Sequence, residues 1–398
     1  MKNKILHILQ NVEKPIRYIG NEINLKRKKW DDSKVKFAFS FPDLYEIGMS
    51  HKGSKLLYSI LNKMENAICE RVFAPWLDME KALRENNLPL YSLESFQPIK
   101  SFDILGFTLQ TPLGYTNLLN ILDLSNIAIK SNEQSEDDPL VIAGGPCATN
   151  PEPLSAFIDA FVIGDGEKVI KDIVNTYEKV RDLSREEKLK ALAKLEGVYV
   201  PAFYDITYNE RGMIEKIEKK YDFLPDRVRI TKISNMDESL GDESHLLPLT
   251  IVAQDRLAVE IMRGCGRGCR FCNAGFIYRP LREKSIKNIL DEIEEGVNAL
   301  GETKVSLLSL STSDYQEIVK LVEDILDIYQ NQYISCSLPS LRLDNFPLEL
   351  AERIAEVRKS GLTFALEAGS QRLRDVINKN VSEQDLFETL ERVLEKGW

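Results

Sequence analysis

The sequence lacks a hydrophobic run long enough to cross a membrane, and residues 1–6 show no apolar leader of the kind that directs secretion. Cysteine is also scarce, with six in 398 residues. Three of the six, Cys69, Cys147 and Cys336, lie far apart, so we expect no disulfide framework. These absences predict a cytoplasmic protein that works in a reducing compartment and makes no membrane contact.

Positive charge is in deficit, since 52 Lys and Arg face 62 Asp and Glu and the net charge is −10. This balance disfavours nonspecific binding to phosphate backbones, although a local basic patch would still leave nucleic acid open as a partner. Apolar residues at 43% and charged residues at 29% are ordinary for a globular protein. The length predicts two or three domains, and we find no internal repeat or low-complexity tract.

The other three cysteines form a dense cluster, Cys265, Cys269 and Cys272, with a Cys-x3-Cys-x2-Cys spacing. Such a spacing could place the thiols on one helical face. However, glycines lie between them, and each glycine costs a helix interior roughly 1 kcal/mol relative to alanine. The pattern therefore predicts a glycine-rich loop, whose glycines are Gly264, Gly266 and Gly268.

A glycine-rich loop allows the backbone to approach a bulky anionic group and to aim its N–H groups at sulfur. Zinc and iron–sulfur sites usually have four protein ligands. Here the next cysteine is Cys336, and the nearest histidine is His245 in a polar linker. The composition of the loop thus indicates three ligands and one open position, with a structural zinc site or unligated redox thiols as alternatives.

The run Cys265, Cys269, Phe271 and Cys272 resembles the hallmark of the radical S-adenosylmethionine (SAM) superfamily, Cys-x3-Cys-aromatic-Cys. The resemblance implies that the three cysteines hold a [4Fe-4S] cluster and that the fourth iron binds SAM. It also implies an electron donor, such as flavodoxin or ferredoxin, and release of a 5′-deoxyadenosyl radical.

The same resemblance assigns further residues to SAM. Phe271 would lie near the adenine, and the turn after the second strand would contact the amino group through backbone carbonyls. A later turn would lie near the ribose and methionine, although a strand-end acid followed by a helix N-cap explains its residues equally simply. Arg279 and Arg282 are candidates for a carboxylate or for surface pairing. The residues of the two turns are Ser311, Thr312 and Ser313, and then Glu367 and Ser370.

Residues 1–180 alternate between predicted strands and helices, which indicates a parallel sheet covered on both faces, as in flavodoxin-like or Rossmann-like domains. Ser50 is the expected N-cap of the first main helix, which carries an apolar stripe from Leu56 to Leu61. The other helices are expected near residues 77–86, 115–125 and 167–180, and the strands at 35–39, 104–108, 140–143 and 160–163.

The turns that follow these strands resemble the cobalamin-binding-type domain that precedes the barrel in one branch of radical SAM proteins. In that domain the first turn supplies a histidine ligand for cobalt, but Tyr45 occupies this position here. The resemblance therefore implies either cobalamin bound without histidine ligation or a docking domain without a ligand. The residues concerned are Asp43, Tyr45 and Gly48, then Gly144 and Gly145, and Gly166.

Residues 181–255 are expected to connect two domains through a helix at 185–195, a hairpin pairing 198–200 with 206–208, and an acidic linker at 237–244. Residues 256–398 predict a partial (β/α) barrel with four βα units. Its strands are expected at 257–262, 304–310, 333–338 and 362–367, with a helix at 285–300. Chemistry in such barrels lies at the C-terminal ends of the strands, where the cysteine loop falls. Because radical SAM barrels usually have six units, we expect a fragment or a chain that needs more polypeptide.

The predicted function is that of a radical SAM enzyme, possibly cobalamin-assisted, that abstracts hydrogen from an unknown substrate. One alternative is a methylthiotransferase acting on RNA or protein. That activity would need a second cluster from three N-terminal cysteines, and only Cys69 and Cys147 lie upstream. The other alternative is a non-catalytic scaffold stabilised by a metal.

Overall fold

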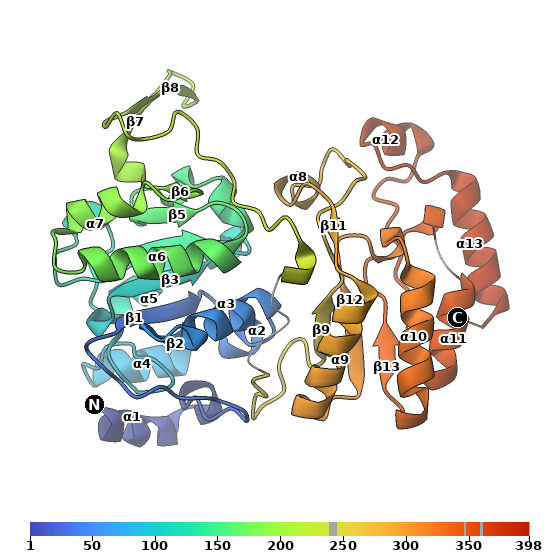
Figure 1. Cartoon of the computed structure of the whole chain (residues 1–398), viewed down its shortest axis with the longest axis horizontal. Helices are drawn as coiled ribbons and strands as arrows, with labels where there is room; N and C mark the ends of the chain where they lie inside the picture. The colour runs from blue at the N-terminus through green and yellow to red at the C-terminus, as the bar shows by residue number, and fades with distance from the viewer. Residues whose placement is uncertain (239–244, 346–347, 359–360, 398) are drawn as a thin grey trace. The chain divides into compact units, whose positions relative to one another are not determined.

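The computed structural model describes residues 1–238, 245–345, 348–358 and 361–397. The chain divides into two compact units (Figure 1). Unit 1 comprises residues 1–233 and 242–255, and unit 2 comprises residues 234–241 and 256–398. Most of the acidic linker expected at 237–244 lies outside the described residues. Among the described residues, no helix is both long and apolar enough to span a membrane.

Unit 1 is built on a six-stranded sheet with the order β2-β1-β3-β4-β5-β6. Its first five strands in this order are parallel, and β6 is antiparallel to β5. The order β2-β1-β3-β4-β5 is that of flavodoxin-like domains, so the predicted parallel α/β sheet is confirmed. The strands are β1 (Val35–Phe41), β2 (Ala67–Phe73), β3 (Ile104–Thr108), β4 (Leu140–Gly144), β5 (Ala160–Val162) and β6 (Val198–Tyr199).

Helices cover both faces of this sheet because its strands are apolar on both sides. Phe37 and Phe39 contribute to the core beneath α3 and α6, whereas Ala38 contributes to the core beneath α1, α4 and α5. The short α2 follows β1, and α7 packs against α6. The helices are α1 (Lys2–Ile8), α2 (Tyr45–Gly48), α3 (Lys52–Lys63), α4 (Leu77–Glu85), α5 (Tyr115–Leu124), α6 (Gly166–Val180) and α7 (Arg185–Leu192).

The predicted N-cap of α3 is wrong. His51, not Ser50, caps the helix, and its Nδ1 accepts a hydrogen bond from the Ser54 backbone N–H at 3.1 Å. Burial lowers the pKa of His51 to about 4, so the imidazole is neutral and can accept. The Ser50 hydroxyl instead donates to the Glu46 carbonyl at 2.7 Å.

The predicted hairpin between residues 198–200 and 206–208 is not formed. Residues 206–208 belong to β7 (Tyr204–Tyr208), which pairs antiparallel with β8 (Ile214–Lys219) across the turn that contains Gly212. Residues 198–199 form β6 and join the main sheet. Sequence alternation identifies strands but does not say which of them exchange hydrogen bonds.

Unit 2 contains a three-stranded parallel sheet with the order β13-β12-β9. Leu257, Val259, Val305 and Leu307 pack against helices α9 to α11, and the opposite face carries small residues such as Ser306. The strands are β9 (Leu257–Glu260), β12 (Lys304–Leu308) and β13 (Ser335–Ser337), and the helices that cover them are α9 (Ile286–Leu300), α10 (Ile318–Tyr329) and α11 (Leu348–Arg358).

The fourth strand predicted for unit 2, at residues 362–367, is not formed. Residues 361–366 alternate between exposed and half-buried positions, yet none of them pairs with another strand. The neighbouring ladder between β12 and β13 is itself only three residue pairs long. The described residues therefore form an open sheet of three strands followed by α12 (Gln371–Val376) and α13 (Glu383–Glu395), without a closed barrel.

Candidate metal centre

The cysteine loop leaves the sheet of unit 2 beyond β9 and runs between β10 (Met262–Arg263) and α8 (Ala274–Ile277). β10 pairs antiparallel with β11 (Arg282–Glu283), which closes the base of the loop. At Gly264, φ is +90°, and a Cβ would lie 2.7 Å from the carbonyl oxygens of Tyr278 and Pro280. This position thus requires glycine, and the predicted loop conformation is confirmed.

Backbone N–H groups of the loop point at two of the three sulfur atoms. Cys265 Sγ accepts from the Arg267 N–H at 3.5 Å, and Cys272 Sγ accepts from the Gly275 N–H at 3.4 Å. The thiols of Cys265, Cys269 and Cys272 are all half-buried. Such donors favour anionic sulfur, so the donor set fits a cluster held by three thiolates. In the part of the chain that the structure describes, no three His, Cys, Asp or Glu side chains are gathered around a single-ion site.

The loop backbone is anchored from the end of α12. The Arg270 N–H donates to the Ile377 carbonyl at 2.9 Å. Asn378 Nδ2 donates to the carbonyls of Gly268 at 2.9 Å and Arg267 at 3.3 Å. Three hydrogen bonds therefore join the middle of the loop to residues 377 and 378, which follow α12.

An ion pair links the loop to the turn after β12. Arg267 Nε donates to Asp314 Oδ2 at 2.7 Å, and Arg267 Nη2 also donates to Asp314 Oδ1. Burial favours the neutral form of Asp314, but hydrogen bonds from Arg267 and Ser311 outweigh it and lower the pKa of Asp314. The carboxylate therefore stays ionised. Sequence reasoning could not pair these residues, because 47 positions separate them.

The turn predicted to contact the amino group of SAM is buried. Ser311 Oγ donates to Asp314 Oδ2 at 2.7 Å, and Thr312 Oγ1 donates to the Pro339 carbonyl. Ser311, Thr312 and Ser313 are each at most 4% exposed. The carbonyls of Ser311 and Thr312 accept the N–H groups of Asp314 and Tyr315. The hydroxyl groups of Ser311 and Thr312 are thus used inside the protein.

The other residues assigned to SAM lie in different surroundings. The Phe271 side chain is 52% exposed. Glu367 has a φ of +67° and pairs with Lys379 at 3.4 Å. Ser370 is the N-cap of α12, and its hydroxyl accepts from the Leu373 N–H at 3.3 Å, as the simpler alternative predicted.

Arg279 and Arg282 shape the far side of the loop. Arg279 Nε donates to the Gly275 carbonyl at 2.9 Å, and its guanidinium lies 4.6 Å from the Phe276 ring centroid. Arg282 donates to the carbonyls of Pro280 and Tyr278, each at 3.2 Å. The two roles suggested by the sequence for these arginines, binding a carboxylate or pairing at the surface, both stay predictions.

In unit 1, the residues assigned to cobalamin lie at the C-terminal edge of the sheet, but Tyr45 points into the core. Its hydroxyl donates to Glu22 Oε1 at 2.9 Å, and the residue is 3% exposed. Burial and the adjacent Glu22 carboxylate raise the pKa of Tyr45. Because His51 nearby caps α3, this turn does not fit a histidine-ligated cobalamin.

The glycines of these turns are packed against protein atoms. A Cβ at Gly48 would lie 2.2 Å from the Phe73 ring, and one at Gly145 would lie 2.7 Å from the Leu109 carbonyl oxygen. Gly144 and Gly166 would meet Val162 and Leu57 at 3.7 and 3.3 Å. The Asp43 side chain accepts from the Leu44 N–H at 2.7 Å. Close packing therefore accounts for Gly48 and Gly145 without a ligand.

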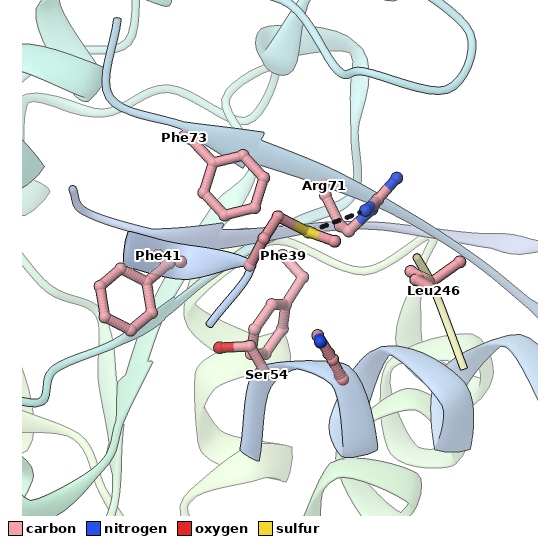
Figure 2. Close-up of a pocket in the computed structure, with 9 residues that line it drawn as sticks. Phe39, Phe41, Ser54, Arg71, Phe73 and Leu246 are labelled. Atoms are coloured by element: carbon pink, nitrogen blue, oxygen red, sulfur yellow. Dashed lines mark hydrogen bonds between the residues drawn. The ribbon is translucent and has the colours of Figure 1, made fainter. Parts of the chain in front are cut away.

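Arg71 on β2 forms a buried charge cluster that the sequence did not reveal. Its Nε donates to Glu94 Oε1 at 2.6 Å and its Nη2 to Glu22 Oε2 at 2.8 Å. The adjoining pocket, lined by Phe39, Phe41 and seven other residues, holds about 10 Å³ of free space (Figure 2). That volume accommodates about one water molecule, so this pocket is a packing feature and not a cofactor site.

Two family models match this chain. The model for the N-terminal part of radical SAM proteins matches residues 53–201, and the model for the radical SAM superfamily matches residues 259–398. The second match contains all three clustered cysteines.

Several curated proteins are similar in sequence. The uncharacterized protein MJ0966 of Methanocaldococcus jannaschii is 31% identical over 77% of this chain and 59% of its own length. The uncharacterized methyltransferase PH0819 of Pyrococcus horikoshii is 23% identical over 75% of this chain and 59% of its own length. A tRNA-2-methylthio-N(6)-dimethylallyladenosine synthase of Thermotoga petrophila is 24% identical over 42% of this chain and 39% of its own length. The chain thus spans 59% of the length of the first two relatives.

A similar solved structure is TsrM from Kitasatospora setae, a radical SAM methyltransferase with cobalamin and a [4Fe-4S] cluster bound. The TM-score is 0.58 at 14% identity, over 91% of this chain and 64% of TsrM. At this identity the likeness concerns the fold alone. The two family models show that this chain belongs to the radical SAM superfamily, with the N-terminal domain of radical SAM proteins ahead of the radical SAM domain that holds the cysteine loop.

Proposed function

We propose that this chain is the cluster-binding part of a radical SAM enzyme and that Cys265, Cys269 and Cys272 hold its [4Fe-4S] cluster. The observation that carries the proposal is the cysteine loop itself. It lies beyond β9 within the matched domain, and its backbone N–H groups point at two of the three sulfurs. When bound, the cluster supplies the electron that splits SAM into methionine and a 5′-deoxyadenosyl radical.

In this proposal the residues of the chain bind and orient the cluster and SAM, and they exclude water from the reaction. Gly264 lets the loop turn tightly against Tyr278 and Pro280. The exposed Phe271 ring is available to stack on the adenine of SAM. The hydroxyls of Ser311 and Thr312 donate within the protein, so a contact of this turn with SAM would use its backbone carbonyls. Glu367 remains the candidate for the ribose, in competition with its Lys379 partner.

Several finer points belong to the same proposal. An electron donor such as flavodoxin or ferredoxin reduces the cluster, in the cytoplasm, where the six free cysteines persist. We also propose the domain boundaries expected from the sequence, near residues 180 and 255. Cobalamin as a second cofactor is supported by the flavodoxin-like strand order. If cobalamin does not purify with the protein, the proposal of a second cofactor is wrong and the rest of the proposed function is unaffected.

Methylthio transfer to RNA or protein is the second candidate, and the match to the Thermotoga petrophila synthase favours it. It would need a second cluster on three cysteines of the N-terminal part. Only Cys69 and Cys147 precede the loop, and Cys69 is 2% exposed within β2. Burial also raises the pKa of the Cys69 thiol, which opposes its use as a thiolate ligand. Hydrogen abstraction from an unidentified substrate is thus the better-supported function.

Iron content tests the proposal. After anaerobic reconstitution, the wild-type protein should contain about four iron and about four sulfide per chain and should be brown. Replacing Cys269 with alanine should abolish the colour and the bound iron, while Cys336→Ala, which alters a buried thiol outside the loop, should retain both. A colourless wild-type protein that binds zinc would favour the scaffold alternative instead.

A further inference from the structure

Arg267 lies inside the cysteine motif, and carboxylates from two different turns bind its guanidinium. Asp314, after β12, accepts from Nε at 2.7 Å and from Nη2. Asp344, after β13, accepts from Nη1 at 3.4 Å. One side chain of the loop therefore contacts the turns that follow two neighbouring strands.

These carboxylates are themselves fixed in place. Ser311 Oγ donates to Asp314 Oδ2 at 2.7 Å. Arg342 donates to Asp344 through Nε at 2.8 Å and Nη2 at 2.9 Å. The network joins two cations to two anions, so its formal charges cancel. Its side chains are between 8% and 31% exposed, which limits screening by solvent.

The geometry of this network depends on an arginine. A guanidinium offers a planar fork of donors that matches a carboxylate with two parallel hydrogen bonds, and it can donate to a second acid through its remaining nitrogen. A lysine ammonium is a point charge and cannot reproduce both contacts. The other anchors of the loop, from Ile377 and Asn378, act on backbone atoms and do not involve this side chain.

We infer that Arg267 is a positioning residue, which sets the spacing of the three thiolates by binding the cluster loop to Asp314 and Asp344 in the turns that follow β12 and β13. The inference rests on the proposed function. It also means that the Asp314 carboxylate is occupied by Arg267 and Ser311 and does not bind the ammonium group of SAM.

The test compares four variants with the wild-type protein: Arg267→Lys, Arg267→Gln, Asp314→Asn and the double variant Arg267→Gln/Asp314→Asn. Each is reconstituted anaerobically, and the rate at which a chelator removes iron is measured. The electron paramagnetic resonance spectrum of the reduced cluster is recorded with and without SAM. The matched control is Arg353→Gln, which removes an exposed arginine that pairs with Glu323 at 3.3 Å on the helical layer.

Arg267→Gln should lose iron about 10-fold faster than the wild-type protein and should show an altered cluster spectrum, because partners outside the ligand set typically change metal affinity by about 10- to 100-fold. Arg267→Lys should be intermediate. The double variant should lose iron no faster than Arg267→Gln, since both substitutions remove the same contact. The control should match the wild-type protein.

Equal rates and spectra for the wild-type, Arg267→Lys and Arg267→Gln proteins would overturn the inference while leaving the proposed function intact. So would a double variant whose effect is the product of the two single effects. A wild-type protein that takes up no cluster would overturn the proposed function, and the inference with it. If Arg267→Gln does not fold by circular dichroism, Arg267→Lys and Asp344→Asn are judged by the same criteria.

Discussion

At the scale of single residues, Gly48 shows how a position that resembles a ligand-binding motif can be explained by packing. The glycine lies at the end of α2, and an added methyl group would meet the Phe73 ring at 2.2 Å and Phe41 Cβ at 3.0 Å. Both rings belong to the core of unit 1. Gly48 therefore allows α2 to approach β1 and β2 closely.

Gly48→Ala should destabilise unit 1 by about 1 to 3 kcal/mol, because an extra methyl group in a well-packed core forces its neighbours to shift. Urea unfolding followed by circular dichroism measures this loss. Gly369→Ala is the matched control, since no atom lies within 4 Å of its added Cβ. An unchanged unfolding midpoint for Gly48→Ala would show that close packing is not the reason for this glycine.

The buried cluster around Arg71 has a pH dependence whose sign can be stated. Burial opposes ionisation of Glu22, but attraction and hydrogen bonds from Arg71 outweigh it and lower the pKa of Glu22 below its ordinary value of 4.5. The stability that this ionised group contributes is therefore present above about pH 4.5 and is lost as the pH falls through the folded-state pKa. For Glu94, burial dominates and raises the pKa, so its contribution has the opposite sign.

Arg71→Met should lower the free energy of unfolding by about 3 to 5 kcal/mol at neutral pH, because it leaves two buried carboxylates without their cation. The deficit relative to the wild-type protein should shrink as the pH falls, since protonation of Glu22 and Glu94 removes the uncompensated charge. Urea unfolding at several pH values measures both effects. A deficit that grows toward acid pH would contradict the assigned pairing.

At the same residue scale, only part of the candidate site could be predicted from sequence. The three cysteines were identifiable because ligand spacing is local. Arg267, Asp314 and Asp344 come together only through the parallel sheet, so their network has no local signature. Ser311 and Thr312 were assigned to SAM through their backbone carbonyls, which stays a prediction, and the hydrogen bonds of their hydroxyls to Asp314 and Pro339 had no signature in the sequence.

At the scale of helices and strands, regular patterns were predictable and pairings were not. Three of the strands of unit 1, β3, β4 and β5, lie where apolar runs end in glycine or polar turns. β2 escaped notice because it contains the charged pair Glu70 and Arg71, both of which are buried. A buried ion network makes a buried edge strand look like a surface segment in sequence.

Unit 2 gives the complementary case. The alternation in residues 362–367 predicts a strand, but a strand forms only where a neighbour offers hydrogen-bonding groups in register. β13 pairs with β12 over three residues, and residues 361–367 are not part of a strand. The N-cap of α3 in unit 1 also depends on tertiary structure. Burial lowers the pKa of His51, so its neutral imidazole can accept a hydrogen bond, and burial is not visible in the sequence.

At the scale of the whole molecule, two family models match one chain. The first match lies in unit 1 and the second lies in unit 2. The radical SAM match begins at residue 259 and includes the cysteine loop with all of its anchors. The chain spans 59% of the length of its first two relatives. The proposed SAM cleavage would depend on unit 2, which contains the cysteine loop.

Formation of 5′-deoxyadenosine from SAM tests the central claim most directly. The reconstituted wild-type protein, reduced with dithionite under anaerobic conditions, should produce 5′-deoxyadenosine and methionine in equal amounts, and Cys269→Ala should produce neither. Intact SAM after incubation with a wild-type protein that carries its full complement of iron and sulfide would contradict the claim.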